Sequence, residues 1–176
     1  MLKWSHQLDG GASLALRDPW QTEEYHALGD RNLDRLQQWE AWAHLDRSVE
    51  ATRGFLVDGL RSYAEGTQVP TVVVADGKIV GSVGLYLDQD AKIASLGYWV
   101  DQDAEGRGLA FAAASCLVDL AFDDLGMRRL EIRTAAHNLR ALRLAERLGL
   151  SAEGVLRSAL VLPRGTYDVA IWARVL

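Results

Sequence analysis

The sequence predicts a single α/β (α+β) domain over residues 1–176, built on a mixed, mostly antiparallel central sheet with helices on both faces. Three observations lead to this fold class. Apolar residues at helical spacing fill the first third of the chain, two β-branched runs flank an Asp-Gly turn in the middle, and strand and helix patterns alternate towards the end. A chain of 176 residues buries a substantial core, and no repeat or Pro/Gly-rich linker divides it.

The first third is predicted to form one strand and three helices. Alternation over Ser13–Arg17 favours a strand, and Pro19 with the two acids after it opens a helix through about Leu28. The third helix covers Val49–Tyr63, with Ser48 as its N-cap. The second helix is indicated by four apolar residues at helical spacing: Leu33, Leu36, Trp39 and Trp42.

The middle of the chain predicts an antiparallel meander. Thr71–Ala75 and Lys78–Leu87 are rich in β-branched residues and flank Asp76-Gly77, which is typical of a hairpin. Ala91–Val100 continues antiparallel to the second of these strands. A glycine-containing turn follows, and then a helix to about Leu125.

The last part of the chain predicts a strand, a helix and a closing hairpin. Arg128–Ala135 forms the strand and Leu139–Leu148 the helix, which Gly149 closes. The hairpin comprises Leu156–Leu162 and Tyr167–Val175.

The stretch Leu96–Ala110, LGYWVDQDAEGRGLA, predicts an anion site. It passes from an apolar strand through a short turn into a helix, so several unpaired N–H groups point to one place where the helix dipole favours negative charge. Gly106 and Gly108 carry no side chain, which allows a phosphate to contact the main chain. We therefore expect a pyrophosphate here.

Two known phosphate loops do not fit this turn. A P-loop needs Gly-Lys-Ser/Thr, whereas Gly108 is followed by Leu109 and Ala110. A dinucleotide-binding loop needs a small sixth residue, which is Phe111 here, and an acid at the end of the next strand.

The turn resembles the coenzyme A loop of the GNAT superfamily of N-acetyltransferases, (Gln/Arg)-x-x-Gly-x-Gly/Ala. Asp103 replaces the first residue of that pattern, an exchange common in the RimJ/RimL branch. Further segments resemble motifs of this branch in the same order and together cover about three quarters of the chain: Arg31–Trp42, Leu96–Val100, Asp119–Gly126, Asn138–Leu150, Glu153–Arg157 and Gly165–Asp168.

The resemblance implies a GNAT fold, in which two strands splay apart and admit the pantetheine arm of acetyl-CoA. It implies coenzyme A contacts from Trp99, Val100, Glu105, Gly106, Arg107, Gly108, Leu109, Ala110, Asn138 and Arg143. It implies catalytic roles for Glu153 and Asn138, and an acceptor pocket that includes Arg31, Asn32, Trp42 and Tyr98.

Several of these roles have a structural alternative. Asn138 could serve as a helix N-cap as well as a ligand contact, and Glu153 could pair with Arg157. Arg107 and Arg143 could point to solvent. The residues that correspond to the serine of the branch and to the tyrosine acid of many GNAT enzymes are Ala141 and Ala145, so no general acid is identified.

The composition of the chain limits the classes of binding partner that are expected. The formal charge of −5 argues against nucleic acid, while residues 126–164 carry a net charge of +5 and the remainder −10, which suits a polyanionic cofactor and a cationic acceptor. The single cysteine, Cys116, suits a reducing cytoplasm, and no stretch indicates a signal peptide or a membrane span. We expect acetyl-CoA as cosubstrate and no metal. The oligomeric state is left open by the sequence, although the C-terminal strand pair could build the sheet of a homodimer.

The sequence therefore predicts a cytoplasmic, acetyl-CoA-dependent N-acetyltransferase. Without a well-defined base, an α-amine with a pKa of about 8 is a better acceptor than a lysine, because about a tenth of it is neutral at pH 7. We expect a protein or peptide N-terminus, such as that of a ribosomal protein. The alternatives are a small-amine acetyltransferase, acting on a polyamine, antibiotic or amino compound, and a non-catalytic acyl-CoA sensor.

Overall fold

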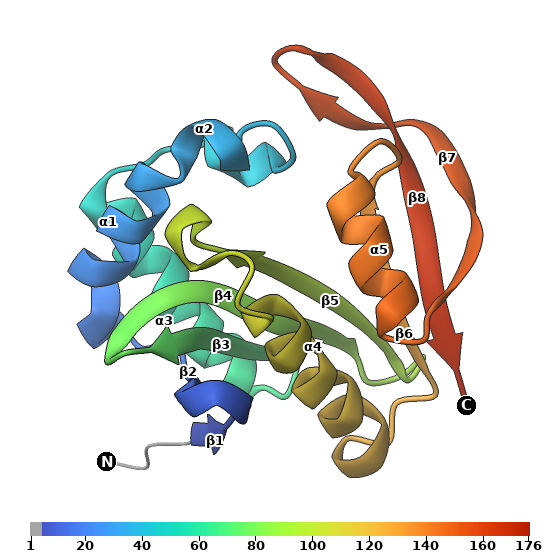
Figure 1. Ribbon diagram of the computed structural model, residues 1–176, viewed down its shortest axis with the longest axis horizontal. Coiled ribbons are helices and arrows are strands. Elements are labelled where there is room, and N and C mark those ends of the chain that lie inside the picture. Colours follow the sequence, from blue (N-terminus) through green and yellow to red (C-terminus); the bar gives the residue numbers. More distant parts are fainter. Residues whose placement is uncertain (1–4) are drawn as a thin grey trace.

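A computed structural model describes residues 5–176 as one mixed sheet covered by helices on both faces (Figure 1). Within these residues the sheet has eight strands in the order β1-β2-β3-β4-β5-β6-β8-β7. Neighbouring strands are antiparallel except β5 and β6, which run parallel. The bounds are β1 Ser5–Gln7, β2 Ser13–Leu16, β3 Gln68–Ala75, β4 Lys78–Asp88, β5 Ile93–Val100, β6 Arg129–Ala135, β7 Ser151–Leu162 and β8 Gly165–Val175. The predicted fold class is confirmed.

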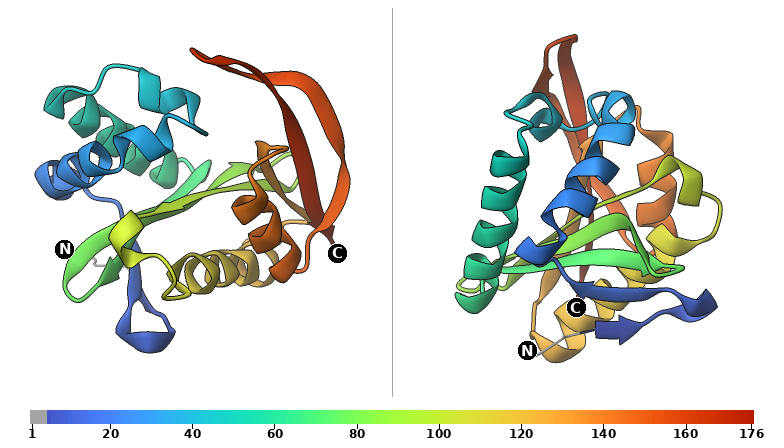
Figure 2. Two further views of the ribbon diagram at one scale, coloured as in Figure 1. Left: turned by 45° about the horizontal axis from the view of Figure 1, so that its top comes forward. Right: turned by 90° about the vertical axis from the view of Figure 1, so that its left-hand side faces the viewer.

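The helices divide between the two faces of the sheet (Figure 2). Helices α1 to α3 cover one face and α4 and α5 the other. Their bounds are α1 Thr22–Arg31, α2 Leu33–Leu36, α3 Val49–Ala64, α4 Leu109–Asp119 and α5 Leu139–Arg147. Within residues 5–176 no helix has the length and apolar character needed to cross a membrane.

Two apolar clusters hold the layers together. Adjacent residues of a strand point to opposite faces, so Val73 packs with the α4 and α5 side while Val72 packs with Leu28 of α1 and Leu56 of α3. All four side chains are fully buried. Apolar burial of this kind contributes about 1.5–3 kcal/mol for each such side chain and fixes the sheet between its two helical layers.

Strands β5 and β6 separate partway along their length. Their pairing covers only Ile93–Ser95 of β5 against Arg129–Glu131 of β6. From Leu96 onwards β5 keeps its β4 partner, and β6 keeps β8 through Ala135, but the two strands no longer pair with each other. The edge of β5 that faces β6 is therefore free over Leu96–Val100, which is the gap that the resemblance implied.

The structure corrects the predicted second helix. Helix α2 ends at Leu36, and a separate 3₁₀ turn follows at Ala41–His44. The Gln37 amide donates to the Ala43 carbonyl at 3.1 Å, and a ring nitrogen of His44 lies 3.0 Å from the Gln37 carbonyl, so these bonds hold a turn where the apolar spacing indicated a continuous helix.

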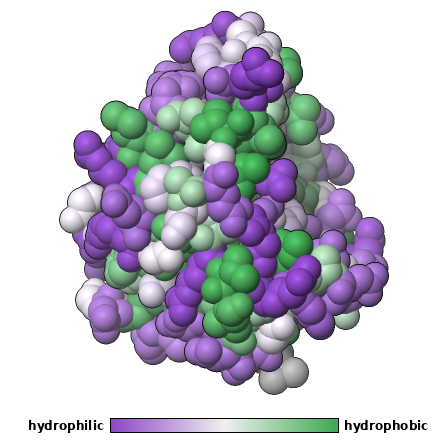
Figure 3. Space-filling view, turned by 90° about the vertical axis from the view of Figure 1, so that its right-hand side faces the viewer, coloured by the Kyte–Doolittle hydropathy of each residue, from purple (hydrophilic) through white to green (hydrophobic). Residues whose placement is uncertain are grey.

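Two edge strands differ from the prediction. Strand β1 was not predicted, and β7 begins at Ser151, before the predicted start at Leu156. All side chains of β1 are exposed, as are those of the first nine residues of β7, so neither segment shows the alternation by which strands are predicted. Figure 3 shows the side of the molecule where β7 and β8 lie, with hydrophobic surface gathered between hydrophilic side chains. Val155, Leu156 and Val161 of β7 are exposed large hydrophobic residues.

Candidate active site

The glycine turn between β5 and α4 has the geometry of an anion cradle. Gly106 and Gly108 both adopt φ +75°, and a Cβ placed on either would meet no atom within 4 Å. The first main-chain hydrogen bond of α4 runs from the Ala112 N–H to the Gly108 carbonyl, so the N–H groups of the turn have no helical partner. The open space beside them, at the positive end of the helix dipole, fits a phosphate.

Charged side chains surround this turn. The Glu105 carboxylate accepts from Arg35 of α2 and from Arg140 of α5, each at 2.6 Å, and so connects the turn with helices on both sides of it. Arg107 pairs with Asp76 of the β3–β4 hairpin at 3.0 Å, and both side chains are well exposed. The structure thus gives Arg107 a partner on the protein surface beside the turn, and its predicted contact with coenzyme A stays a prediction.

Arg31 and Asn32 hold the start of the turn. Two guanidinium nitrogens of Arg31 donate to the Asp101 carboxylate at 2.9 and 2.6 Å, and the Asn32 amide donates to its other oxygen at 2.9 Å. The side-chain oxygen Oδ1 of Asn32 accepts from the Gln102 main-chain N–H at 3.0 Å. Both residues thus hold the start of the turn through Asp101 and Gln102, and neither lines the large cavity between the sheet and helices α1 and α3. Their predicted place in the acceptor pocket stays a prediction.

Asp101 should therefore be important for stability. Its side chain is buried, and although burial by itself raises its pKa, the hydrogen bonds from Arg31 and Asn32 outweigh this and lower the pKa. Such a carboxylate stabilises the fold above its ordinary pKa of 3.8, and the contribution is lost as the pH falls through the lowered value. We expect Asp101→Asn to lose about 2 kcal/mol in urea denaturation at pH 7.

The exposed pair Asp58–Arg61, joined at 3.0 Å on α3, provides the control for this measurement. Asp58→Asn should change the free energy of unfolding by less than about 0.5 kcal/mol, because exposed ion pairs contribute little. Equal effects of the two substitutions would contradict this role of Asp101.

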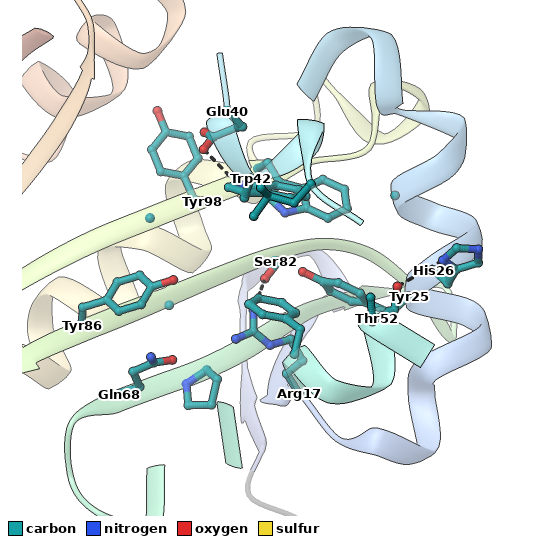
Figure 4. A pocket seen from close by; sticks show the side chains of 18 of the residues that line it. Arg17, Tyr25, His26, Glu40, Trp42, Thr52, Gln68, Ser82, Tyr86 and Tyr98 are labelled. Carbon is teal, nitrogen blue, oxygen red and sulfur yellow. Dashed lines mark hydrogen bonds between the residues drawn. The ribbon is translucent and has the colours of Figure 1, made fainter. Parts of the chain in front are cut away.

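A cavity of about 540 Å³ lies on the other side of β5, between the sheet and helices α1 and α3 (Figure 4). Aromatic side chains of its lining come from Tyr25, Trp42, Phe55, Tyr86, Tyr98 and Trp99, and we call it the aromatic cavity. Trp42 and Tyr98 were predicted to line the acceptor pocket, and the structure brings both to this cavity. Because Tyr98 and Trp99 belong to the free part of β5, the cavity adjoins the gap between the splayed strands.

Glu40 lines the cavity at the end where Trp42 and Tyr98 lie (Figure 4). Burial raises the pKa of its carboxyl, with the opposing hydrogen bond from the Trp42 indole N–H, 2.9 Å away, too weak to cancel the effect. Burial and the nearby charge of Glu40 raise the pKa of the Tyr98 phenol, which therefore stays protonated. Glu40 also lines a second cavity of about 240 Å³ with Arg133, Thr134 and Ala135 of the splayed half of β6.

Sequence reasoning missed Glu40. The residue lies between Trp39 and Trp42, inside a segment assigned to a helix, where a carboxylate reads as part of a solvated helical face. The signal that could have found it is an acid between two tryptophans, Trp39 and Trp42, the second of which donates a hydrogen bond to it in the structure.

Comparison with known proteins identifies the family. The model of the family described as "Acetyltransferase (GNAT) domain" matches residues 14–151. This chain belongs to the GNAT acetyltransferase family. The resemblance seen in its motifs is thereby confirmed.

Individual GNAT relatives match over nearly the whole chain. "Putative ribosomal N-acetyltransferase YdaF" of Bacillus subtilis (strain 168) is 29% identical over 163 residues, which are 92% of this chain and 89% of that protein. A crystal structure of a "Probable acetyltransferase" is 27% identical with a TM-score of 0.92, covering 98% of this chain and 97% of that one. A RimL ribosomal L7/L12 alpha-N-protein acetyltransferase in complex with coenzyme A shares the fold, with 22% identity, a TM-score of 0.93 and 98% coverage of both chains.

Helix α5 follows β6 and borders the gap between the splayed strands β5 and β6, which we call the GNAT cleft. The side-chain oxygen Oδ1 of Asn138 accepts from the Ala141 main-chain N–H at 3.2 Å, so this residue is the N-cap of α5, and its contact with the cofactor stays a prediction. Arg143 is exposed on the same helix, while Ala141 and Ala145 are buried. His137, just before the cap, packs between the rings of Trp39 and Tyr167 at centroid distances of 5.1 and 5.2 Å.

The structure does not bring Glu153 to the GNAT cleft. Its carboxylate accepts from Arg129 at 2.8 and 2.5 Å, and Arg129 opens β6 where that strand is still paired with β5. Glu153 thus lies at the closed end of the strand pair, and its structural partner is Arg129 in place of the expected Arg157. The hydrogen bond from Arg129 lowers the pKa of Glu153, which makes it a weaker base. Its predicted catalytic role is not supported by this position.

Proposed function

We propose that this protein transfers an acetyl group from acetyl-CoA to the α-amine of a protein N-terminus, with ribosomal proteins as the substrate class. The observation that carries the proposal is the free edge of β5, which has the anion cradle at its end and the aromatic cavity beside it. Two relatives support the N-terminal acceptor: the Bacillus subtilis protein is named as a ribosomal N-acetyltransferase, and RimL is described as an α-N-protein acetyltransferase.

The residues present fit acetyl-CoA. The turn over residues 105–110 would hold its pyrophosphate through main-chain N–H groups, because the space in front of Gly106 and Gly108 is open. Unpaired main-chain groups of Trp99 and Val100 would pair with the pantetheine arm, as a further strand would. When bound, acetyl-CoA supplies the activated acyl group, and this chain supplies position and charge.

We further propose Glu40 as the general base. Its raised pKa lies closer to neutral pH than that of an ordinary carboxyl, and general bases are most efficient when their pKa is near the working pH. Glu40 would accept the proton that the amine loses as the new C–N bond forms. The C–S bond would break with its electron pair going to sulfur, so that coenzyme A leaves as the thiolate. Tyr98, which keeps its proton, would donate a hydrogen bond in the same part of the cleft.

Turnover of acetyl-CoA with a mixed panel of acceptors tests the function. We expect acetylation of peptides with a free N-terminus and none of the same peptides blocked at the N-terminus but carrying lysine. Preferred acetylation of polyamines or other small amines would replace the proposal with the small-amine alternative. Tight acetyl-CoA binding without any acetylation would favour a sensor, in line with Ala141 and Ala145 on α5.

Two further properties stay proposals. We place the protein in the cytoplasm, where its acceptors would be made. We also propose that the exposed apolar side chains of the edge strand β7 contact a second copy of the chain, because an unpaired strand edge with apolar side chains favours association.

A further inference from the structure

The aromatic cavity contains a buried cation at the end away from Glu40. Arg17 directly follows β2, its side chain lines the cavity, and only 6% of the residue is exposed. Figure 4 shows Arg17 and Gln68 at one end of the cavity and Glu40 and Tyr98 at the other. The interior of the cavity therefore carries a positive charge. The net negative charge of the chain outside residues 126–164, where Arg17 lies, does not predict it.

The guanidinium of Arg17 has few partners. One terminal nitrogen donates to the Ser82 hydroxyl at 3.3 Å, and the group lies 4.2 Å from the centroid of the Phe55 ring. The Nε atom is buried without a hydrogen-bond partner, and among residues 5–176 none of the ion pairs involves Arg17. A buried guanidinium is ordinarily paired with a carboxylate, because the desolvation of a lone charge is costly.

The fold maintains this arrangement. Gly59 of α3 is buried against the guanidinium, and a Cβ at that position would lie 3.2 Å from its second terminal nitrogen. The main-chain N–H of Arg17 donates to the Pro70 carbonyl at 3.0 Å, which fixes the start of the side chain at the floor of the cavity. The cation is thus held in place before any ligand is bound.

The other charged groups that line the cavity already have partners. Arg47 pairs with Asp30, the Asp46 carboxylate accepts from the Ser48 N–H, and Glu40 accepts from Trp42. Arg17 is thus the cavity cation that lacks an acid within the described residues. A planar guanidinium with free donors is well suited to a carboxylate, which it can bind through two parallel hydrogen bonds.

We propose that Arg17 binds a carboxylate of the acceptor, so that the substrate is an amine that also carries an anionic group. This inference rests on the proposed function, which places the reacting amine near Glu40 at the opposite end of the same cavity. The carboxylate could come from an acidic side chain near a protein N-terminus or from a small amino acid. Both sources present the same chemistry to Arg17, and the experiment separates them.

The test compares matched acceptors with and without the carboxylate. One pair is a peptide with Glu at its second or third position and the same peptide with Gln there, and the other is β-alanine and β-alaninamide. We expect the wild-type protein to favour the carboxylate member of one pair by about 10-fold in kcat/KM, the effect of a hydrogen bond to a charged group. The pair that shows the preference identifies the source.

Arg17→Gln should abolish this preference, so that the ratio of kcat/KM values is about 1, whereas Arg17→Lys should retain part of it. Because the preference is a ratio measured on one protein sample, it does not depend on the fraction of the variant that folds. Arg61→Gln removes the same charge from the exposed face of α3, outside the cavity, and should leave the ratio unchanged. A wild-type protein without preference, or an unchanged ratio in Arg17→Gln, would overturn the proposal.

A binding measurement separates this inference from the proposed function. If no acceptor is acetylated, the proposed function fails, and the Arg17 site is tested through the fluorescence of Trp42 and Trp99, which line the cavity. Titration with the same Glu and Gln peptides and with β-alanine and β-alaninamide should then show tighter binding of a carboxylate member to the wild-type protein. This difference should disappear in Arg17→Gln, and equal affinities for both members of each pair would overturn the inference.

Discussion

Replacing Gly108 by alanine is expected to weaken acetyl-CoA binding by about 100-fold, which corresponds to about 3 kcal/mol and to the loss of one or two charge-assisted hydrogen bonds. Gly108 adopts φ +75°, and the space in front of it is open, so an added Cβ would occupy the position proposed for the pyrophosphate. The side chain also destabilises this backbone conformation by about 1 kcal/mol. Isothermal titration calorimetry with acetyl-CoA measures the effect.

Gly149 provides a control with the same backbone strain. It closes α5 with φ +78°, also without an atom within 4 Å of an added Cβ. Gly149→Ala should therefore lose similar stability in thermal unfolding and keep the affinity for acetyl-CoA. If both variants bind acetyl-CoA as well as the wild type does, the glycine turn is not the pyrophosphate site, and the proposed acetyltransferase activity loses its main support.

Glu40→Gln is expected to lower kcat by about 100-fold, the usual contribution of a positioned general base. The substitution keeps the shape of the side chain and an oxygen for the Trp42 indole N–H, so the aromatic cavity should persist. In the wild-type protein the rate should fall as the pH drops through the pKa of Glu40, which burial raises above the ordinary value of 4.5. The variant should lack this limb of the pH profile.

As the pH rises through the titration of Glu40, the stability of the protein should fall while its activity rises. Because the pKa of Glu40 is raised in the folded state, folded protein holds the proton more tightly than unfolded protein between pH 4.5 and the raised value. The free energy of unfolding therefore falls as the pH rises through this window. At pH 7 the Gln variant avoids burying a charge and should be at least as stable as the wild type in urea denaturation.

Glu153→Gln is the matched control for Glu40→Gln. Glu153 is paired with Arg129 at the closed end of the strand pair, so the same chemical change there should leave kcat and its pH profile unchanged. The assignment of the base would be overturned if Glu153→Gln lost the acidic limb while Glu40→Gln retained it.

Most of the fold could be predicted from the sequence because its signals are local. The Asp76-Gly77 turn, the Ser48 N-cap and the glycine turn before α4 each depend on a few neighbouring residues, and the structure contains all three. The short α2 differs from its prediction because the contact between Gln37 and Ala43 competes with helical hydrogen bonding, which apolar spacing does not reveal. The β7 edge was underestimated because its exposed side chains carry no alternation.

By itself the sequence determined the main-chain part of the site, because positive φ at Gly106 and Gly108 and free N–H groups at a helix start follow from residue types close together in the chain. Only the tertiary structure decided which side chains face the cavity. Arg31 and Asn32 meet Asp101 about 70 residues away, and Arg17 meets Ser82 across 65 residues. Such pairings depend on how the layers pack, which residue types alone do not specify. The packing places Glu153 beside Arg129, outside the cleft, and places Glu40 and Arg17 at opposite ends of one cavity (Figure 4).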